Sequence, residues 1–146
     1  MKVHNECRLE FLSRSSNESF ARMTAAAFAA QLDPTLEELE DIKTAVSEAV
    51  TNCIVHAYPE EMGRIRMRMR VLDGSVLEIL VQDWGRGIED IEKAREPLFT
   101  TGGDSRGGMG FTIMESFTDK LRVRSRPGKG TAVIMQRQIR PRTRRP

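Results

Sequence analysis

Three polar residues, Glu48, Asn52 and His56, follow one another at steps of four in the segment AVSEAVTNCIVHAY, residues 45–58. Apolar residues between them recur at the spacing of one buried helical face, so this segment is predicted to be a helix whose polar side chains share one column. A carboxylate there can take a proton from a hydroxyl group, and an amide oxygen can bind Mg²⁺. Glu-x-x-x-Asn alone is a weak signal, because a solvated helix edge explains it more simply.

A second candidate site is the segment DWGRG, residues 83–87, which directly follows a predicted strand. The carboxylate of Asp83 can accept a hydrogen bond from an amino group such as N6 of adenine. Gly85 and Gly87 allow the backbone to turn and to approach a flat ligand closely. Taken by itself, this segment is typical of any tight turn.

The third candidate is the glycine-rich segment GGDSRGGMGF, residues 102–111. Gly107, Gly108 and Gly110 are predicted to open a helix whose free amides can bind an anion, and Arg106 can reach a terminal phosphate. The pattern GxxxxGK[ST] is absent from the sequence, which excludes a P-loop, and no GxGxxG follows a strand, which disfavours a Rossmann site. A flexible linker is the alternative.

In this order, the three segments resemble the N, G1 and G2 boxes of the GHKL ATPase superfamily. Segments outside the boxes are also similar to one family within it, the anti-sigma-F factors of sporulating bacteria, which are small serine kinases. These segments are NESFAR, AAQLDPTLEELEDIKTAVSEAVTN, PLFTT and GMGFTIMESF. The resemblance extends over residues 7–136.

The resemblance implies a role for each matching residue. Glu48 would be the general base, Asn52 the Mg²⁺ ligand, Asp83 the residue that reads adenine, and Thr131 a threonine near the base. Gly85 and Gly87 would form the turn beneath adenine. The phosphate loop and lid would contain Thr100, Thr101, Arg106, Gly107, Gly108 and Gly110. His56 matches no catalytic position, and a hydrogen-bonded histidine at a helix end is the preferred interpretation.

The resemblance also implies an activity with two parts. A homodimer using ATP or ADP with Mg²⁺ would bind the sigma-F factor and would phosphorylate a serine of an anti-anti-sigma protein. Arg22 is the candidate contact for both partners. The alternatives are a stress-response anti-sigma-B kinase, a nucleotide-gated binding module without phosphotransfer, and the ATPase domain of a histidine kinase. Trp84, in the variable position of DxGxG, and a short glycine-rich lid depart from the family pattern.

The elements that must position these residues are short and mixed in type. Residues 7–12 are predicted to be an edge strand, residues 64–81 a hairpin that turns at Asp73-Gly74, and the chain around 127–128 a second hairpin. Helices are predicted to begin at Ser15 and Thr35, each with a glutamate three positions later as a capping box, and a third helix is predicted over 110–121. The sequence therefore predicts an α+β two-layer sandwich with helices on one face of a mixed, largely antiparallel sheet.

Length and composition limit the number of domains, the compartment and the kinds of partner that can be expected. The 146 residues, 39% of them hydrophobic, suit one domain, expected over 1–136, with a basic tail over 137–146. The two cysteines lie far apart in the sequence, and no apolar run is long enough to span a bilayer, so a cytoplasmic protein is expected. The net charge is only +2, and five arginines crowd the tail. Such a tail could contact nucleic acid or an acidic partner, but a disordered terminus is the preferred interpretation, and neither a nucleic-acid nor a membrane partner is expected.

Overall fold

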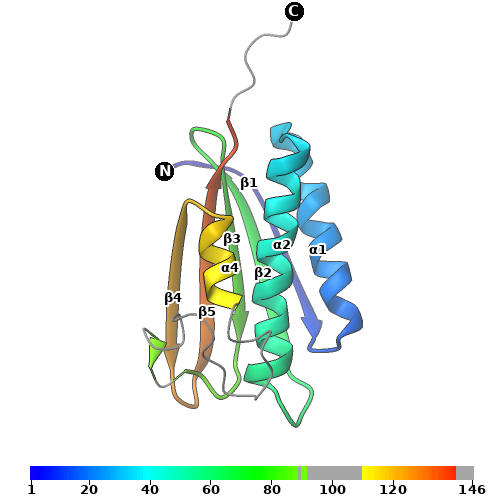
Figure 1. The fold of residues 1–146 in the computed structure, drawn as a ribbon, viewed down its shortest axis with the longest axis vertical. Coiled ribbons are helices and arrows are strands. Elements are labelled where there is room, and N and C mark those ends of the chain that lie inside the picture. The colour runs from blue at the N-terminus through cyan, green and yellow to red at the C-terminus, as the bar shows by residue number, and fades with distance from the viewer. Residues whose placement is uncertain (89, 92–109, 141–146) are drawn as a thin grey trace, which may run out of the picture.

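The described part of the chain has two layers, helices on one face of a single sheet (Figure 1). The computed structural model describes residues 1–88, 90–91 and 110–140. The strands are β1 (Val3–Leu12), β2 (Arg64–Leu72), β3 (Val76–Asp83), β4 (Lys120–Arg126) and β5 (Gly130–Gln138). The helices are α1 (Ser16–Ala29), α2 (Leu36–Asn52) and α4 (Gly110–Ser116), with a 3-10 turn at Ala30–Leu32 and a π-helical turn at Cys53–Ala57. The predicted α+β class is confirmed.

The sheet has the strand order β1-β2-β3-β5-β4, and each neighbouring pair is antiparallel. β1 is an edge strand, as predicted. The hairpin between β2 and β3 turns where the sequence predicts, since Gly74 has φ 77° and Ser75 has φ 60°. This order places the last residues of β3 beside the first residues of β5, where Asp83 is opposite Thr131.

The core lies between the helices and one face of the sheet. Alternate residues of β2 are fully buried against the helices, and α2 contributes one apolar stripe. α1 contributes alanines at every fourth position, and such small side chains let it approach its neighbours closely. The main core residues are Ala21, Ala25, Ala29, Ile42, Val46, Val50, Ile65, Met67, Met69 and Met114.

The other face of the sheet has no helix over it in the described structure and is predominantly charged. Arginines occupy alternate positions of β2 on this face, as predicted. Arg66 lies 2.6 Å from Glu10 of β1, and both Arg68 and Arg70 lie 3.5 Å from Glu78 of β3. Glu10 and Glu78, with Glu6 at 4.0 Å from Arg70, therefore offset part of the charge of this row of arginines.

The two predicted capping boxes have different outcomes. Thr35 is extended, with ψ 164°, and its side chain and that of Glu38 bond each other's backbone amides, so this box is confirmed. The box predicted at Ser15 is wrong. Ser15 has φ −58° and ψ −31°, a helical conformation rather than the extended one that a cap needs, and its side chain makes no capping bond. Glu18 accepts a hydrogen bond from Ser47 of α2 instead, at 2.9 Å.

Two element ends differ from their predicted positions. The helix predicted over 110–121 ends at Ser116, because Lys120 already belongs to β4. β5 continues to Gln138, beyond the expected domain boundary at 136. Residues of the expected tail also join the fold: Arg137 lies 3.0 Å from Asp41 of α2, and the amide of Arg140 donates to Glu38 at 3.1 Å. Residues 141–146 lie outside the described chain.

No helix among the described residues is both long and apolar enough to cross a membrane.

Candidate functional site

Glu48 and Asn52 lie on the last turns of α2, and both side chains are half-buried. They keep the α-helical relation of four residues and therefore share one face, as predicted. After Asn52 the helix widens into the π-helical turn Cys53–Ala57, in which the amide of Tyr58 bonds the Cys53 carbonyl at 3.2 Å. His56 lies within this turn, at the end of the helix, as predicted.

Asp83 is the last residue of β3 and points toward the helices. Its side chain is buried, with the residue only 4% exposed. One carboxylate oxygen accepts the amides of Gly85 at 2.9 Å and Thr131 at 3.2 Å, and the Cys53 thiol donates to the same carboxylate. Burial raises the pKa of Asp83, although these three donors oppose the shift. The result is a buried hydrogen-bond acceptor in a nearly closed set of donors.

The glycines of DxGxG allow the loop after Asp83 to pack against two other segments. A Cβ on Gly85 would overlap the carbonyl of Ala57 at the end of the π-helical turn, and the amide of Arg86 bonds that carbonyl at 3.2 Å. Gly87 has φ 76°, and a Cβ there would overlap the carbonyl of Arg126. The loop is therefore held between the end of α2 and the β4–β5 hairpin.

Ser125 joins the same loop to β5, a role that the sequence analysis did not predict. Its hydroxyl accepts the amide of Ile88 at 2.8 Å, lies 3.0 Å from the carbonyl of Gly130, and lies 2.7 Å from the Thr131 hydroxyl. The Ser125 hydroxyl has a single proton, and the carbonyl of Gly130 can only accept, so this proton must point to that carbonyl. All three contacts are therefore satisfied together only when Thr131 donates to Ser125. The Thr131 oxygen is then left as an acceptor.

Tyr58 is a second residue that the sequence analysis missed. It is buried, its hydroxyl donates to the carbonyl of Arg64 at 2.8 Å, and it accepts the amide of Trp84 at 2.7 Å. Burial raises its pKa, so the phenol stays protonated at neutral pH. Tyr58 thus links the end of α2, the start of β2 and the residue after Asp83. Periodicity offers no signal for these contacts, which join distant parts of the chain.

Trp84, the departure from the family motif, lies beside an arginine of the open face. Its side chain is partly exposed, and the guanidinium carbon of Arg66 lies 5.3 Å from its ring centroid. Arg66 belongs to the sheet face without helices, whereas Asp83 points to the other face. The Trp84 ring therefore extends away from the buried carboxylate.

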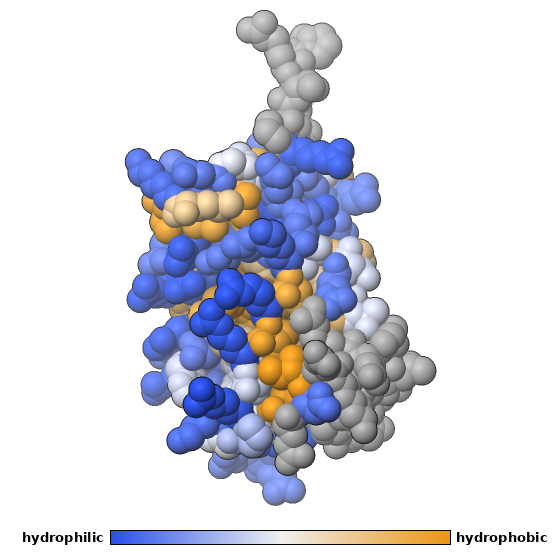
Figure 2. Space-filling model, turned by 90° about the vertical axis from the view of Figure 1, so that its left-hand side faces the viewer, coloured by the Kyte–Doolittle hydropathy of each residue, from blue (hydrophilic) through white to orange (hydrophobic). Residues whose placement is uncertain are grey.

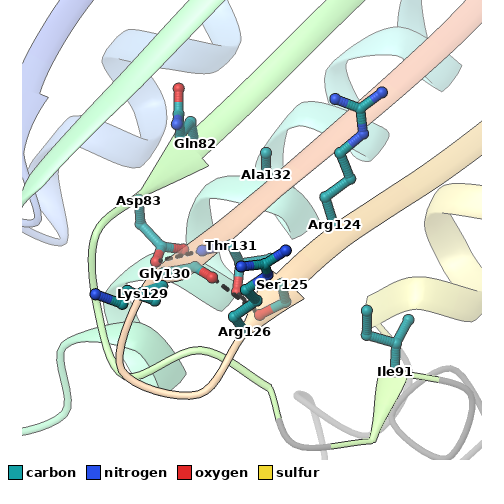
Figure 3. A pocket seen from close by; sticks show the side chains of 10 residues that line it. All are labelled: Gln82, Asp83, Ile91, Arg124, Ser125, Arg126, Lys129, Gly130, Thr131 and Ala132. Carbon is teal, nitrogen blue, oxygen red and sulfur yellow. Dashed lines mark hydrogen bonds between the residues drawn. The ribbon is translucent and has the colours of Figure 1, made fainter.

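A cavity of about 560 Å³ lies at the ends of β3, β4 and β5 (Figure 3). It combines the buried Asp83 and the half-buried Thr131 with positively charged residues of the β4–β5 hairpin. Residues from the helix-covered face and from the uncovered face of the sheet both line this cavity, so the cavity extends around the end of the sheet. The lining residues are Gln82, Asp83, Ile91, Arg124, Ser125, Arg126, Lys129, Gly130, Thr131 and Ala132.

Several predicted site residues lie outside the described residues. They are Thr100, Thr101, Arg106, Gly107 and Gly108. Gly110 is the first residue of α4, so the third motif does lead into a helix, as predicted. Within the described chain, no three His, Cys, Asp or Glu side chains form a cluster suited to a metal ion.

Arg22, the predicted partner contact, is held by its own helix. Its guanidinium lies 3.5 Å from Glu18 and donates to Ser19 at 3.3 Å. Glu18 in turn accepts the hydroxyl of Ser47, the residue before Glu48 on α2. A short chain of contacts therefore connects Arg22 to the helix that carries Glu48 and Asn52.

The polar helix end, the buried aspartate and the glycine loops lie together at one end of the sheet, and comparison with known proteins shows the family to which this arrangement belongs. The family model of the histidine kinase-like ATPase domain matches residues 12–137, and the chain belongs to that family. The RsbU and RsbW domains of a Mycobacterium tuberculosis protein share the fold, with a TM-score of 0.69 and 16% identity over 94% of this chain and 33% of that one. A blue-light activated histidine kinase of Erythrobacter litoralis matches with a TM-score of 0.57 and 28% identity over 73% of this chain and 32% of that one.

Within the family, the chain belongs with the proteins named anti-sigma F factor. It is 59% identical over 140 residues to the one from Caldanaerobacter subterraneus, covering 95% of this chain and 97% of the relative. The protein of that name from Clostridium acetobutylicum is 54% identical over 94% of this chain and 96% of its own. For Geobacillus kaustophilus the identity is 52%, and the coverage is 94% of each chain. The family to which the sequence motifs pointed is thereby confirmed.

Proposed function

We propose that this protein is an ATP-dependent serine kinase and a sigma-F-binding anti-sigma factor. It binds ATP with Mg²⁺ between the end of α2 and the ends of β3 and β5. It phosphorylates a serine of an anti-anti-sigma protein, and as a homodimer it sequesters the sigma factor. The observation that carries the proposal is Asp83, a buried carboxylate held by two backbone amides next to the helix with Glu48 and Asn52.

The hydrogen-bond pattern around Asp83 supports recognition of adenine. Gly85 and Thr131 donate to one carboxylate oxygen and the Cys53 thiol also donates to the carboxylate, which leaves an acceptor position on the other oxygen for a ligand. The Thr131 hydroxyl gives its proton to Ser125 and presents lone pairs. Adenine has an amino group at position 6, which donates, whereas guanine has a carbonyl there. Two acceptors therefore favour adenine, and guanine would leave them unsatisfied.

The chemistry assigned to α2 is a phosphoryl transfer. Glu48 accepts the proton of the partner's serine hydroxyl as the serine oxygen bonds to the γ-phosphorus of ATP. The bond from that phosphorus to the bridging oxygen breaks, and ADP leaves. Asn52 fits a Mg²⁺ ligand, since its half-buried amide lies one turn from Glu48, and Mg²⁺ supplies positive charge to the phosphates.

Partner binding is assigned to Arg22. The ion pair with Glu18 restrains its guanidinium, so less side-chain entropy is lost when a partner carboxylate binds. Relatives of this chain are named for sigma F, which supports a sigma factor as one partner. The anti-anti-sigma protein would compete for the same arginine.

The substitution Glu48→Gln tests the kinase assignment. It removes the proposed base but leaves the nucleotide contacts of Asp83 and Thr131 in place. Calorimetry should show unchanged Mg-ATP affinity, while transfer of labelled γ-phosphate to the anti-anti-sigma protein should fall at least 100-fold. Transfer at the wild-type rate would remove Glu48 from this role. Absence of ATP binding by the wild-type protein would contradict the whole proposal.

A further inference from the structure

The edge strand β4 carries a row of positive charges on the sheet face without helices. Its alternate residues are Lys120, Arg122, Arg124 and Arg126, and all four are exposed. Alternate strand residues point to the same face, about 6.7 Å apart. Lys129, in the following hairpin, is also exposed. We call these five residues the β4 cationic row.

Among the residues that the structure describes, no acidic side chain forms an ion pair with the β4 cationic row. The register partners of its four strand residues on β5 are Gln136, Ile134, Ala132 and Gly130, none of which has a charge. Among the ion pairs of the described residues, none includes a member of the row. The arginines of β2 on the same face differ, since Glu10 and Glu78 form ion pairs with them. Like charges at this spacing repel, so an external anion would stabilise the row.

The backbone of β4 offers a second mode of binding. β4 is the last strand in the order β1-β2-β3-β5-β4, so no strand of the described structure pairs with its outer edge. The view of this side of the molecule shows hydrophilic residues around a narrow hydrophobic strip (Figure 2). An unpaired edge can accept an extended peptide as an additional strand.

We propose that β4 is a docking strand for an acidic, extended segment of a partner protein. The segment pairs its backbone with the outer edge of β4, with which no described strand pairs. Carboxylates at every second position then lie on the open face of the sheet, opposite the cations of the row. This inference depends only on β4 and its neighbours, and it holds whether or not the protein is a kinase.

A nucleic acid is the other anionic polymer, and the structure favours it less. Proteins that bind single strands stack the bases on exposed aromatic side chains. Neither β4 nor β5 contains an aromatic residue. The exposed ring of Trp84 is already paired with Arg66 of β2. Regular spacing along a free strand edge instead matches an extended polypeptide.

Binding of a labelled dodecapeptide of alternating Glu and Thr to the full chain tests the proposal. Fluorescence anisotropy at low salt would compare the wild type with Lys120→Gln/Arg122→Gln, two residues that do not line the cavity at Asp83. The matched control is Arg8→Gln/Arg14→Gln, which removes the same charge from exposed residues of the β1 side. We expect about tenfold weaker binding for the β4 variant and less than twofold change for the control.

Two further probes separate an extended acidic peptide from other anions. A peptide of the same composition with its glutamates in one block should bind the wild type several-fold more weakly, and so should a twelve-residue oligothymidine. Raising the salt concentration should reproduce the loss without any substitution. Nucleotide affinity reports the integrity of each variant. Equal peptide binding by the β4 variant and the wild type, no binding at millimolar peptide, or tighter binding of the oligonucleotide would overturn the proposal.

Discussion

The hydroxyl oxygens of Ser125 on β4 and Thr131 on β5 lie 2.7 Å apart, directly beside the buried Asp83. Ser125 also receives the amide of Ile88 from the loop that follows Asp83. One serine therefore fixes both the loop position and the direction in which the Thr131 proton points. A residue outside every recognised motif is expected to affect which base the site prefers.

Removing the Ser125 hydroxyl should change nucleotide selectivity. In Ser125→Ala the Thr131 hydroxyl is free to rotate and donate, so it no longer disfavours the carbonyl of guanine. We expect about tenfold weaker ATP binding and a smaller ratio of ATP to GTP affinity, measured by calorimetry. Ser19→Ala, on α1, is the control and should alter neither value. A preserved ratio in Ser125→Ala would show that Thr131 is oriented by other contacts.

Replacing Asp83 should separate stability from binding. Burial raises the folded-state pKa of Asp83 above 3.8, so ionisation costs folding free energy; this cost grows as the pH rises from 3.8 to the raised pKa and is constant above it. Asp83→Asn keeps an oxygen for the amides of Gly85 and Thr131 without a charge. Its free energy of unfolding relative to the wild type should rise as pH increases from 3.8 to the raised pKa, and the gain should disappear below pH 3.8.

The same variant should bind ATP about 10–100-fold more weakly, because it lacks the charged acceptor for adenine. Urea denaturation between pH 3.5 and 8, together with calorimetry at pH 7, gives both quantities. A difference in stability that is independent of pH would mean that the carboxylate has its ordinary pKa in the folded protein.

The hydroxyl group of Tyr58 should contribute to the stability of the fold independently of its buried ring. Tyr58→Phe keeps the buried ring but leaves the Trp84 amide and the Arg64 carbonyl without this partner. We expect a loss of about 1–3 kcal/mol in the free energy of unfolding, measured in urea. Trp84→Phe retains the backbone amide and serves as the control, with a smaller loss expected. Equal values for Tyr58→Phe and the wild type would show that water replaces the phenol.

Arg22 should distinguish partner binding from nucleotide binding. Arg22→Glu reverses the charge on α1 and should weaken affinity for the sigma factor and the anti-anti-sigma protein at least tenfold, with ATP affinity unchanged. Glu18→Gln releases Arg22 from its ion pair and should cause a smaller loss, because the arginine must then be ordered on binding. Surface plasmon resonance with immobilised partner measures both, and unchanged sigma affinity in Arg22→Glu would exclude the assignment.

Local sequence patterns predicted much of the fold because they depend on residues close in the chain. The helix after Thr35, the turn at Asp73-Gly74 and the alternation in β2 each follow from neighbours a few positions apart. Local rules failed at Ser15, where a serine with a glutamate three positions later makes no capping box. There Glu18 bonds Ser47 of another helix, a competitor that no local pattern contains.

The sequence by itself indicated the family and the order of the described elements, and it placed Glu48 and Asn52 on one helix face and Asp83 at the end of a strand. It did so because spacing along a helix or strand directly sets which side chains share a face. Only the tertiary structure decided that Ser125 reaches Ile88, 37 positions away, and that Tyr58 reaches Trp84, 26 positions away. These bonds depend on how strands and loops pack in space. Chain distance carries no information about them, because the partners meet only after the sheet has formed.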